Sequence, residues 1–135
     1  YDEGALYLCC TNGGPEKRGQ IFRILPKNDQ RPDPMVELFL EPGKSDLLTS
    51  GDNLCVAPNG DLIICEDLID PFKQQQLPHL RGVTPGGQIF TLARNPDAKN
   101  KYEFCGSTFS PDGSILFVNI QALDQTFAIK GPWRG

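Results

Sequence analysis

Three short turn sequences, placed at almost equal intervals, constrain the fold of this chain more than any other feature. Each contains a small residue or threonine, then a proline, a turn-forming residue and a glycine. They begin at Ala57, Thr84 and Ser110, and their prolines are 27 and 26 residues apart. Asparagine, aspartate and glycine tolerate the backbone angles of tight turns, and short apolar runs flank each turn. The pattern therefore predicts antiparallel hairpins that turn at Asn59, Gly86 and Asp112.

A second repeat indicates how these hairpins combine. Residues 19–24 read Gly-Gln-Ile-Phe-Arg-Ile, and residues 87–92 read Gly-Gln-Ile-Phe-Thr-Leu. Two hairpins in a unit of ~50 residues make up one four-stranded propeller blade. The sequence therefore predicts an all-β fold, a fragment of a β-propeller with about two to three four-stranded blades. A β-sandwich is the competing architecture, but it does not require matched hairpins at this interval.

The predicted blades form a single domain over residues 1–135, with blade regions at about 1–40, 52–93 and 102–130. So few blades cannot close a ring, and an incomplete ring leaves sheet edges and apolar faces without partners. We therefore expect this chain to be the C-terminal part of a longer propeller, packed against the remaining blades or against a partner chain.

Composition narrows the classes of partner. Fourteen glycines and twelve prolines in 135 residues are typical of an all-β chain with many turns. The net charge is -4 and no run of lysine or arginine exists, so nucleic acid is not an expected partner. No apolar stretch approaches the ~20 residues that span a bilayer, so no transmembrane segment is expected.

The five cysteines include no Cys-x-x-Cys pair, which argues against a structural zinc site. Cys55 and Cys65 lie on the two arms of one predicted hairpin, so a disulfide and a pair of buried thiols are both open alternatives. The single histidine, His79, lies in a polar segment that contains proline, and we expect it to be solvated.

The predicted core consists of apolar residues that alternate along short strands without charge. We expect five of them to be buried between sheets: Leu62, Ile64, Phe109, Ile115 and Phe117.

The hairpin over residues 51–67 carries the candidate site. Asp52 and Asn53 open its first strand, and Glu66 and Asp67 close its second. Because the two strands have similar lengths, these polar pairs are expected at the same end of the hairpin. Three carboxylates and an amide are hard oxygen ligands, which suit Ca²⁺ or Fe³⁺. The alternative is an acidic strand end that faces solvent.

Several segments resemble the PhoX family of alkaline phosphatases. They include the Cys-Glu-Asp motif at residues 65–67, Leu-Phe-Val-Asn-Ile-Gln at 116–121 and Gly-Pro-Trp at 131–133. The remaining segments that resemble the family are residues 52–54, 57–64, 81–85, 90–95, 106–113 and 126–130. The resemblance covers nearly the whole chain. It implies a β-propeller metalloenzyme, exported to the periplasm or the cell exterior, that hydrolyses phosphate monoesters of small molecules with Ca²⁺ and Fe³⁺ at its axial mouth.

The same resemblance implies roles for particular residues. Glu66 is the first candidate metal ligand and Glu3 the second, followed by Asp67, Asp52 and Asn53. Arg81 and Arg94 are the candidates for binding the substrate phosphate. No residue is assigned a catalytic role. Upstream ligands of the family, including a cysteine, have no counterpart in this chain, so we expect the chain alone to be catalytically incomplete and to hold no metal by itself.

Two other functions compete with the phosphatase. One is a non-catalytic propeller module for binding or assembly, in which a metal is structural or absent. Ile63 and Ile64 beside the Cys-Glu-Asp motif offer no charge for phosphate, and open sheet edges can pair with another chain. The other is lactone hydrolysis on a calcium propeller, which would require a histidine base; the isolated position of His79 argues against it.

Overall fold

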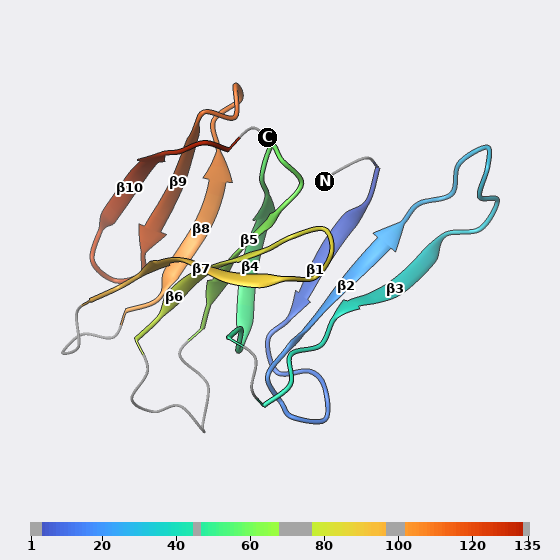
Figure 1. Ribbon diagram of the computed structural model, residues 1–135, viewed down its shortest axis with the longest axis horizontal. Coiled ribbons are helices and arrows are strands. Elements are labelled where there is room, and N and C mark those ends of the chain that lie inside the picture. Colours follow the sequence, from blue (N-terminus) through green and yellow to red (C-terminus); the bar gives the residue numbers. More distant parts are fainter. Residues whose placement is uncertain (1–3, 45–46, 68–76, 97–101, 134–135) are drawn as a thin grey trace.

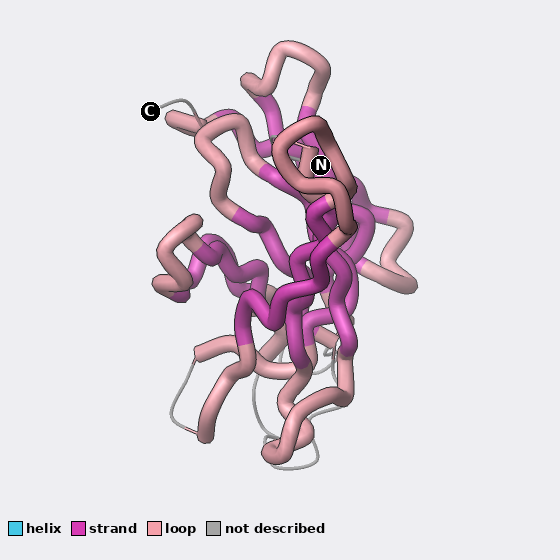
Figure 2. Tube along the Cα trace, turned by 90° about the vertical axis from the view of Figure 1, so that its right-hand side faces the viewer, coloured by secondary structure: helices cyan, strands magenta, loops and turns pink. Residues whose placement is uncertain are grey.

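The computed structural model describes residues 4–44, 47–67, 77–96 and 102–133. In these residues the chain forms ten β-strands and no helix, which confirms the predicted all-β class (Figure 2). The strands are β1 (Leu6–Cys10), β2 (Gln20–Leu25), β3 (Met35–Leu40), β4 (Gly51–Val56), β5 (Leu62–Glu66), β6 (His79–Val83), β7 (Ile89–Arg94), β8 (Phe104–Phe109), β9 (Ile115–Ile120) and β10 (Gln125–Lys130). No helix in the described residues is long and apolar enough to cross a membrane.

The strands form three antiparallel sheets, which lie beside one another in Figure 1. The sheets have the orders β1-β2-β3, β4-β5-β6-β7 and β8-β9-β10. The first strands of the three sheets meet, because β4 contacts β1 on one side and β8 on the other. Apolar layers join the central sheet to both neighbouring sheets, which is the arrangement of a β-propeller fragment, and the described residues do not close it into a ring. The blade boundaries proposed from the sequence stay a prediction.

The three repeated turns have the same hydrogen bond. The N–H of Gly60, Gly87 and Gly113 donates to the carbonyl oxygen three residues earlier, at 2.9, 2.8 and 2.8 Å. All three glycines have positive φ angles, of 87°, 84° and 69°, which other residues adopt only under strain. The predicted turn positions are therefore confirmed, and the recurring glycine is explained by the backbone conformation that closes each hairpin.

The core consists of two apolar layers on either side of the central sheet. Leu62 and Ile64 of β5 face the β1–β3 sheet, whereas Ile63 and Cys65 face the β8–β10 sheet. Each of these four side chains is at most 1% exposed. A strand covered on both faces reads as a continuous apolar run, which explains the sequence of β5.

The predicted core is only partly correct. Leu62 and Ile64 are buried as expected, and Phe109 and Ile115 are half-buried. Phe117 is 36% exposed, which contradicts the prediction. The buried residues of β9 are those on its other face, Leu116, Val118 and Ile120. Alternate residues of a strand point to opposite faces, and β9 is apolar on both, so its sequence did not specify which face packs against β5.

Candidate functional site

Polar residues meet at one end of the central sheet, where β4 and β6 begin and β5 and β7 end. Gly51 pairs with Glu66 across β4 and β5, and His79 pairs with Arg94 across β6 and β7. Glu66 and His79 are also in contact, so the four residues form one row across the sheet. Antiparallel pairing creates this row, because the start of each strand lies beside the end of its neighbour.

Glu66 is buried and holds its charge in an ion pair. Its side chain is 4% exposed, and its Oε1 accepts hydrogen bonds from Arg81 Nε at 2.9 Å and from the Thr49 N–H at 3.1 Å. Arg81 is also 4% exposed and donates a second hydrogen bond from Nη1 to Thr91 Oγ1. The arginine therefore neutralises the carboxylate inside the sheet packing, where an unpaired charge would be costly.

The second oxygen of the carboxylate faces His79. Nδ1 of His79 lies 3.3 Å from Glu66 Oε2, the distance of an ion pair when the imidazole is protonated. We expected His79 to be solvated, but its side chain is only 16% exposed. The sequence could have predicted that His79 lies on the same face as Arg81. His79 precedes Arg81 by two residues, and residues two apart on a strand share a face.

Residues 48–50 cover this end of the sheet. Leu48, Thr49 and Ser50 are at most 5% exposed, and Ser50 has a φ angle of 49°. The Ser50 N–H donates to the carbonyl of Arg18 at 2.7 Å, and the Ser50 carbonyl accepts from the Asp67 N–H at 2.9 Å. This segment therefore ties Glu66 and Asp67 to the first sheet and separates the Glu66 carboxylate from solvent.

Asp52 and Asn53 bind groups other than Glu66, although the sequence placed the three residues at the same hairpin end. The register shifts between Gly51 and Asn53, and Asn53 pairs with Cys65, so its side chain lies on the face opposite to Glu66. Asn53 Oδ1 accepts from the Gly106 N–H at 2.9 Å, and Asn53 Nδ2 donates to Asp52 at 2.9 Å. Asp52 in turn accepts from Thr11 Oγ1 at 3.4 Å. These contacts connect β4 with the turn that follows β1 and with β8.

The predicted oxygen ligands therefore do not converge in the described part of the chain. Within it, no group of three histidine, cysteine, aspartate or glutamate side chains could hold a metal ion. Glu66 is already bound by Arg81, Asp52 and Asn53 bind other groups, and Glu3 lies outside the described residues. The described residues alone thus do not fit a Ca²⁺ or Fe³⁺ centre.

The two candidate phosphate-binding arginines differ in availability. Arg81 is buried and bound to Glu66 and Thr91. Arg94, at the end of β7, is exposed and forms no ion pair within the described residues. Arg94 is therefore the cation of this row that an incoming anion can reach.

Burial makes Cys9 and Cys65 poor candidates for a reactive group. All five thiols are free, so the Cys55–Cys65 alternative is decided in favour of thiols. Burial raises the pKa of Cys65 to about 11, and burial followed by the charge of Asp52 raises the pKa of Cys9 to about 12. Both remain protonated near neutral pH, a state that is a poor nucleophile and a poor metal ligand.

Comparison with known proteins agrees with the resemblance that the motifs indicated. The family described as alkaline phosphatase PhoX matches residues 1–124 of this 135-residue chain. A search of curated proteins finds no match. The family match covers β1 to β9 and the whole row of polar residues, and it ends just before β10. The chain therefore belongs to the PhoX family of alkaline phosphatases.

Proposed function

We propose that this protein is a metal-dependent phosphatase that hydrolyses phosphate monoesters of small molecules. One observation carries the proposal: a chain of the PhoX family gathers a carboxylate, an imidazole and an accessible guanidinium at one end of a sheet. Phosphate oxygens are bound well by guanidinium groups, and an imidazole and a carboxylate are the usual groups for holding protons. Export to the periplasm or the cell exterior is part of the proposal, and the family resemblance supports it.

The chain's own residues would have distinct roles. Arg94 would bind the phosphate, because it is the exposed cation of the row. Glu66 would hold Arg81 and His79 in place through its two oxygens. With Oε2 of Glu66 facing Nδ1 of His79, the imidazole would keep its proton on Nδ1, and Nε2 would be the nitrogen that accepts a proton.

The proposed cofactors are Ca²⁺ and Fe³⁺, as the family resemblance implies. Such ions would neutralise the charge of the phosphate and polarise its oxygens. Glu66, Asp67, Glu3, Asp52 and Asn53 stay the proposed ligands, although Asn53 lies on the face opposite to Glu66 and would not bind the same ion as Glu66. Because Arg81 binds Oε1 of Glu66, a metal ion would compete with Arg81 there or bind at Oε2, which faces His79.

The test is Glu66→Gln in the intact protein, with p-nitrophenyl phosphate turnover and bound metal both measured. If the proposal is correct, metal content and turnover fall together. The matched control is Glu37→Gln, which alters the Glu37–Arg23 pair on the first sheet and should change neither. If the bound metal content and the turnover are unchanged in Glu66→Gln, the role of Glu66 is structural only, as the ion-pair partner of Arg81.

A non-catalytic module for binding or assembly is the second candidate, and one observation favours it. One face of the β1–β3 sheet exposes four large apolar residues to solvent: Leu6 at 45%, Leu8 at 51%, Val36 at 65% and Leu38 at 51%. The strand register places them in two rows on the same face. Contiguous exposed apolar surface of this kind is typical of interaction sites. A protein that binds a partner through this face, but neither retains metal nor hydrolyses phosphate esters, would favour this candidate.

A further inference from the structure

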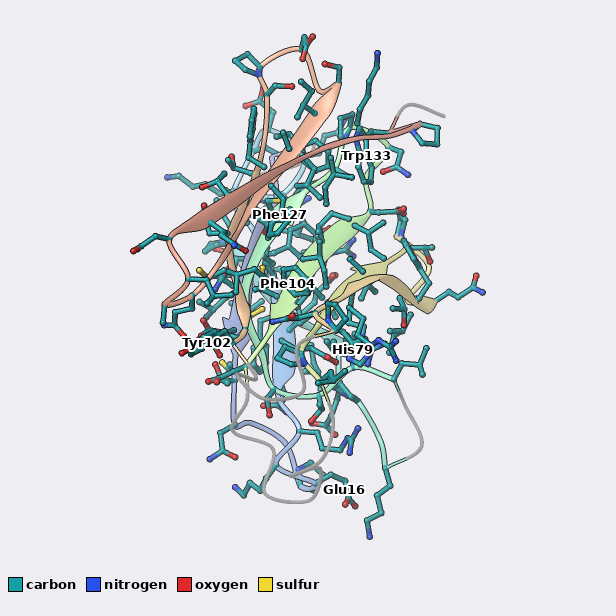
Figure 3. All side chains as sticks on the ribbon, turned by 90° about the vertical axis from the view of Figure 1, so that its left-hand side faces the viewer. Glu16, His79, Tyr102, Phe104, Phe127 and Trp133 are labelled. Atoms are coloured by element: carbon teal, nitrogen blue, oxygen red, sulfur yellow. The ribbon has the colours of Figure 1, made fainter. Side chains whose placement is uncertain are left out.

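A cavity of ≈ 560 Å³ lies between the end of β7 and the β8–β10 sheet. It is lined by Ala93, Arg94, Asn95, Pro96, Phe104, Val118, Ile120, Leu123, Gln125, Phe127 and Ile129. Figure 3 shows Phe104 and Phe127 near each other on this side of the molecule. Its volume is within the ~300–1,000 Å³ that is usual for pockets that bind small molecules.

The lining is apolar with a single charge. Phe104, Val118 and Ile120 are at most 6% exposed, whereas Phe127 is 45% exposed and borders the open side. The lining residues include one cation, Arg94, and no carboxylate. A site of this composition is complementary to an apolar molecule that carries one negative charge, and two aromatic rings favour an aromatic group.

Arg94 connects this cavity with the polar row described above. It lines the cavity and is also the cross-strand partner of His79, which contacts Glu66. An anion bound by Arg94 would therefore lie between the apolar cavity on one side and the His79–Glu66 pair on the other.

We propose that this cavity binds the aromatic group of a phosphate monoester, with Arg94 binding the phosphate. The inference rests on the proposed function and adds a substrate class to it: aromatic phosphates are preferred over small polar ones.

The test compares two exposed phenylalanines of the same sheet. Phe127 lines the cavity, whereas Phe117 is 36% exposed and is not a lining residue. The ratio of kcat/KM for 1-naphthyl phosphate to that for glycerol 2-phosphate is measured in the intact protein and in Phe127→Ser and Phe117→Ser. Loss of one apolar contact should lower the ratio about tenfold in Phe127→Ser, and Phe117→Ser should leave it unchanged.

A binding measurement separates this inference from the proposed function. Naphthalene-1-sulfonate carries the aromatic group and a charge but cannot be hydrolysed. The Kd of the sulfonate should rise about tenfold in Phe127→Ser and in Arg94→Gln, and stay unchanged in Phe117→Ser.

If neither ester is hydrolysed, the proposed function fails, and binding of the sulfonate still tests the inference about the cavity. Equal Kd values in Phe127→Ser and Phe117→Ser would overturn it. If circular dichroism shows that Phe127→Ser is unfolded, Phe127→Leu should change the Kd in the same direction by about threefold.

Discussion

Glu66 Oε1 lies 2.9 Å from Arg81 Nε, and both side chains are 4% exposed. The contact joins the last residue of β5 to the third residue of β6. It explains how an acidic residue can end a fully buried strand without a cation from solution. The two arginines of the site therefore differ in role: Arg81 neutralises the charge of Glu66, whereas Arg94 does not.

Removal of Arg81 should destabilise the protein strongly. In Arg81→Met the Glu66 carboxylate stays buried without its partner, and the free energy of unfolding should fall by about 3–5 kcal/mol. Arg23→Met is the control, because the Arg23–Glu37 pair is about one-third exposed and should cost only about 1 kcal/mol. Urea denaturation measures both. The double variant Glu66→Leu, Arg81→Met should recover much of the loss, and equal losses in the two single variants would contradict a buried pair.

Replacement of Arg94 should affect substrate binding rather than folding. Arg94 is exposed, so Arg94→Gln should change the free energy of unfolding by less than about 0.5 kcal/mol. Loss of a charged hydrogen bond to phosphate should raise KM for p-nitrophenyl phosphate about tenfold or more. Lys130→Gln, at the exposed end of β10, is the control and should leave KM unchanged. Identical KM values for Arg94→Gln and the unmodified protein would show that Arg94 does not bind the substrate.

Truncation of two neighbouring residues of β9 should lower the free energy of unfolding by very different amounts. Leu116 is 0% exposed and packs in the layer between the central sheet and the β8–β10 sheet, so Leu116→Ala should cost about 2–5 kcal/mol. Phe117 is 36% exposed on the other face, so Phe117→Ala should cost less than about 1 kcal/mol. Thermal or urea unfolding of both variants checks the orientation of this strand. A larger loss for Phe117→Ala would mean that the opposite face is the buried one.

Stability should decrease in alkaline solution because of the buried thiols. Folding raises the pKa of Cys65 from 9.0 to about 11, mainly through burial. A group whose pKa is raised by folding stabilises the protein fully below its unfolded pKa, and this contribution is lost as pH rises toward the folded value. Between about pH 9 and 11, ionisation of Cys65 should lower the free energy of unfolding by about 1.4 kcal/mol per pH unit. Urea unfolding of Cys65→Ala across this range should show a correspondingly smaller slope, and an unchanged slope would show that Cys65 does not ionise there.

The hairpins and the all-β class could be predicted from the amino-acid sequence alone. Each repeated turn depends on residues within four positions of one another, and a glycine with positive φ closes it whatever packs around it. The nearly equal spacing of the turns predicted a propeller-like arrangement of sheets. The motifs that resemble the family lie on the strands and turns that these hairpins form. The burial of Leu62 and Ile64 also followed, because β5 is apolar at consecutive positions and is covered on both faces.

The contacts between the polar side chains depend on how the strands pair and pack in three dimensions. The sequence placed Asp52 beside Glu66 from strand length alone, but one register shift after Gly51 turns Asn53 to the opposite face and leaves Asp52 bound to Thr11 and Asn53. Likewise, the pairing of Ile64 with Arg81 sets Arg81 next to Glu66, across a connection of more than ten residues whose path the sequence does not specify. A shift of one residue reverses the face of every side chain on a strand, and the free energy that fixes such a register comes from packing between sheets. The partners of Glu66 and Asp52 were therefore set by long-range contacts that no local pattern encodes.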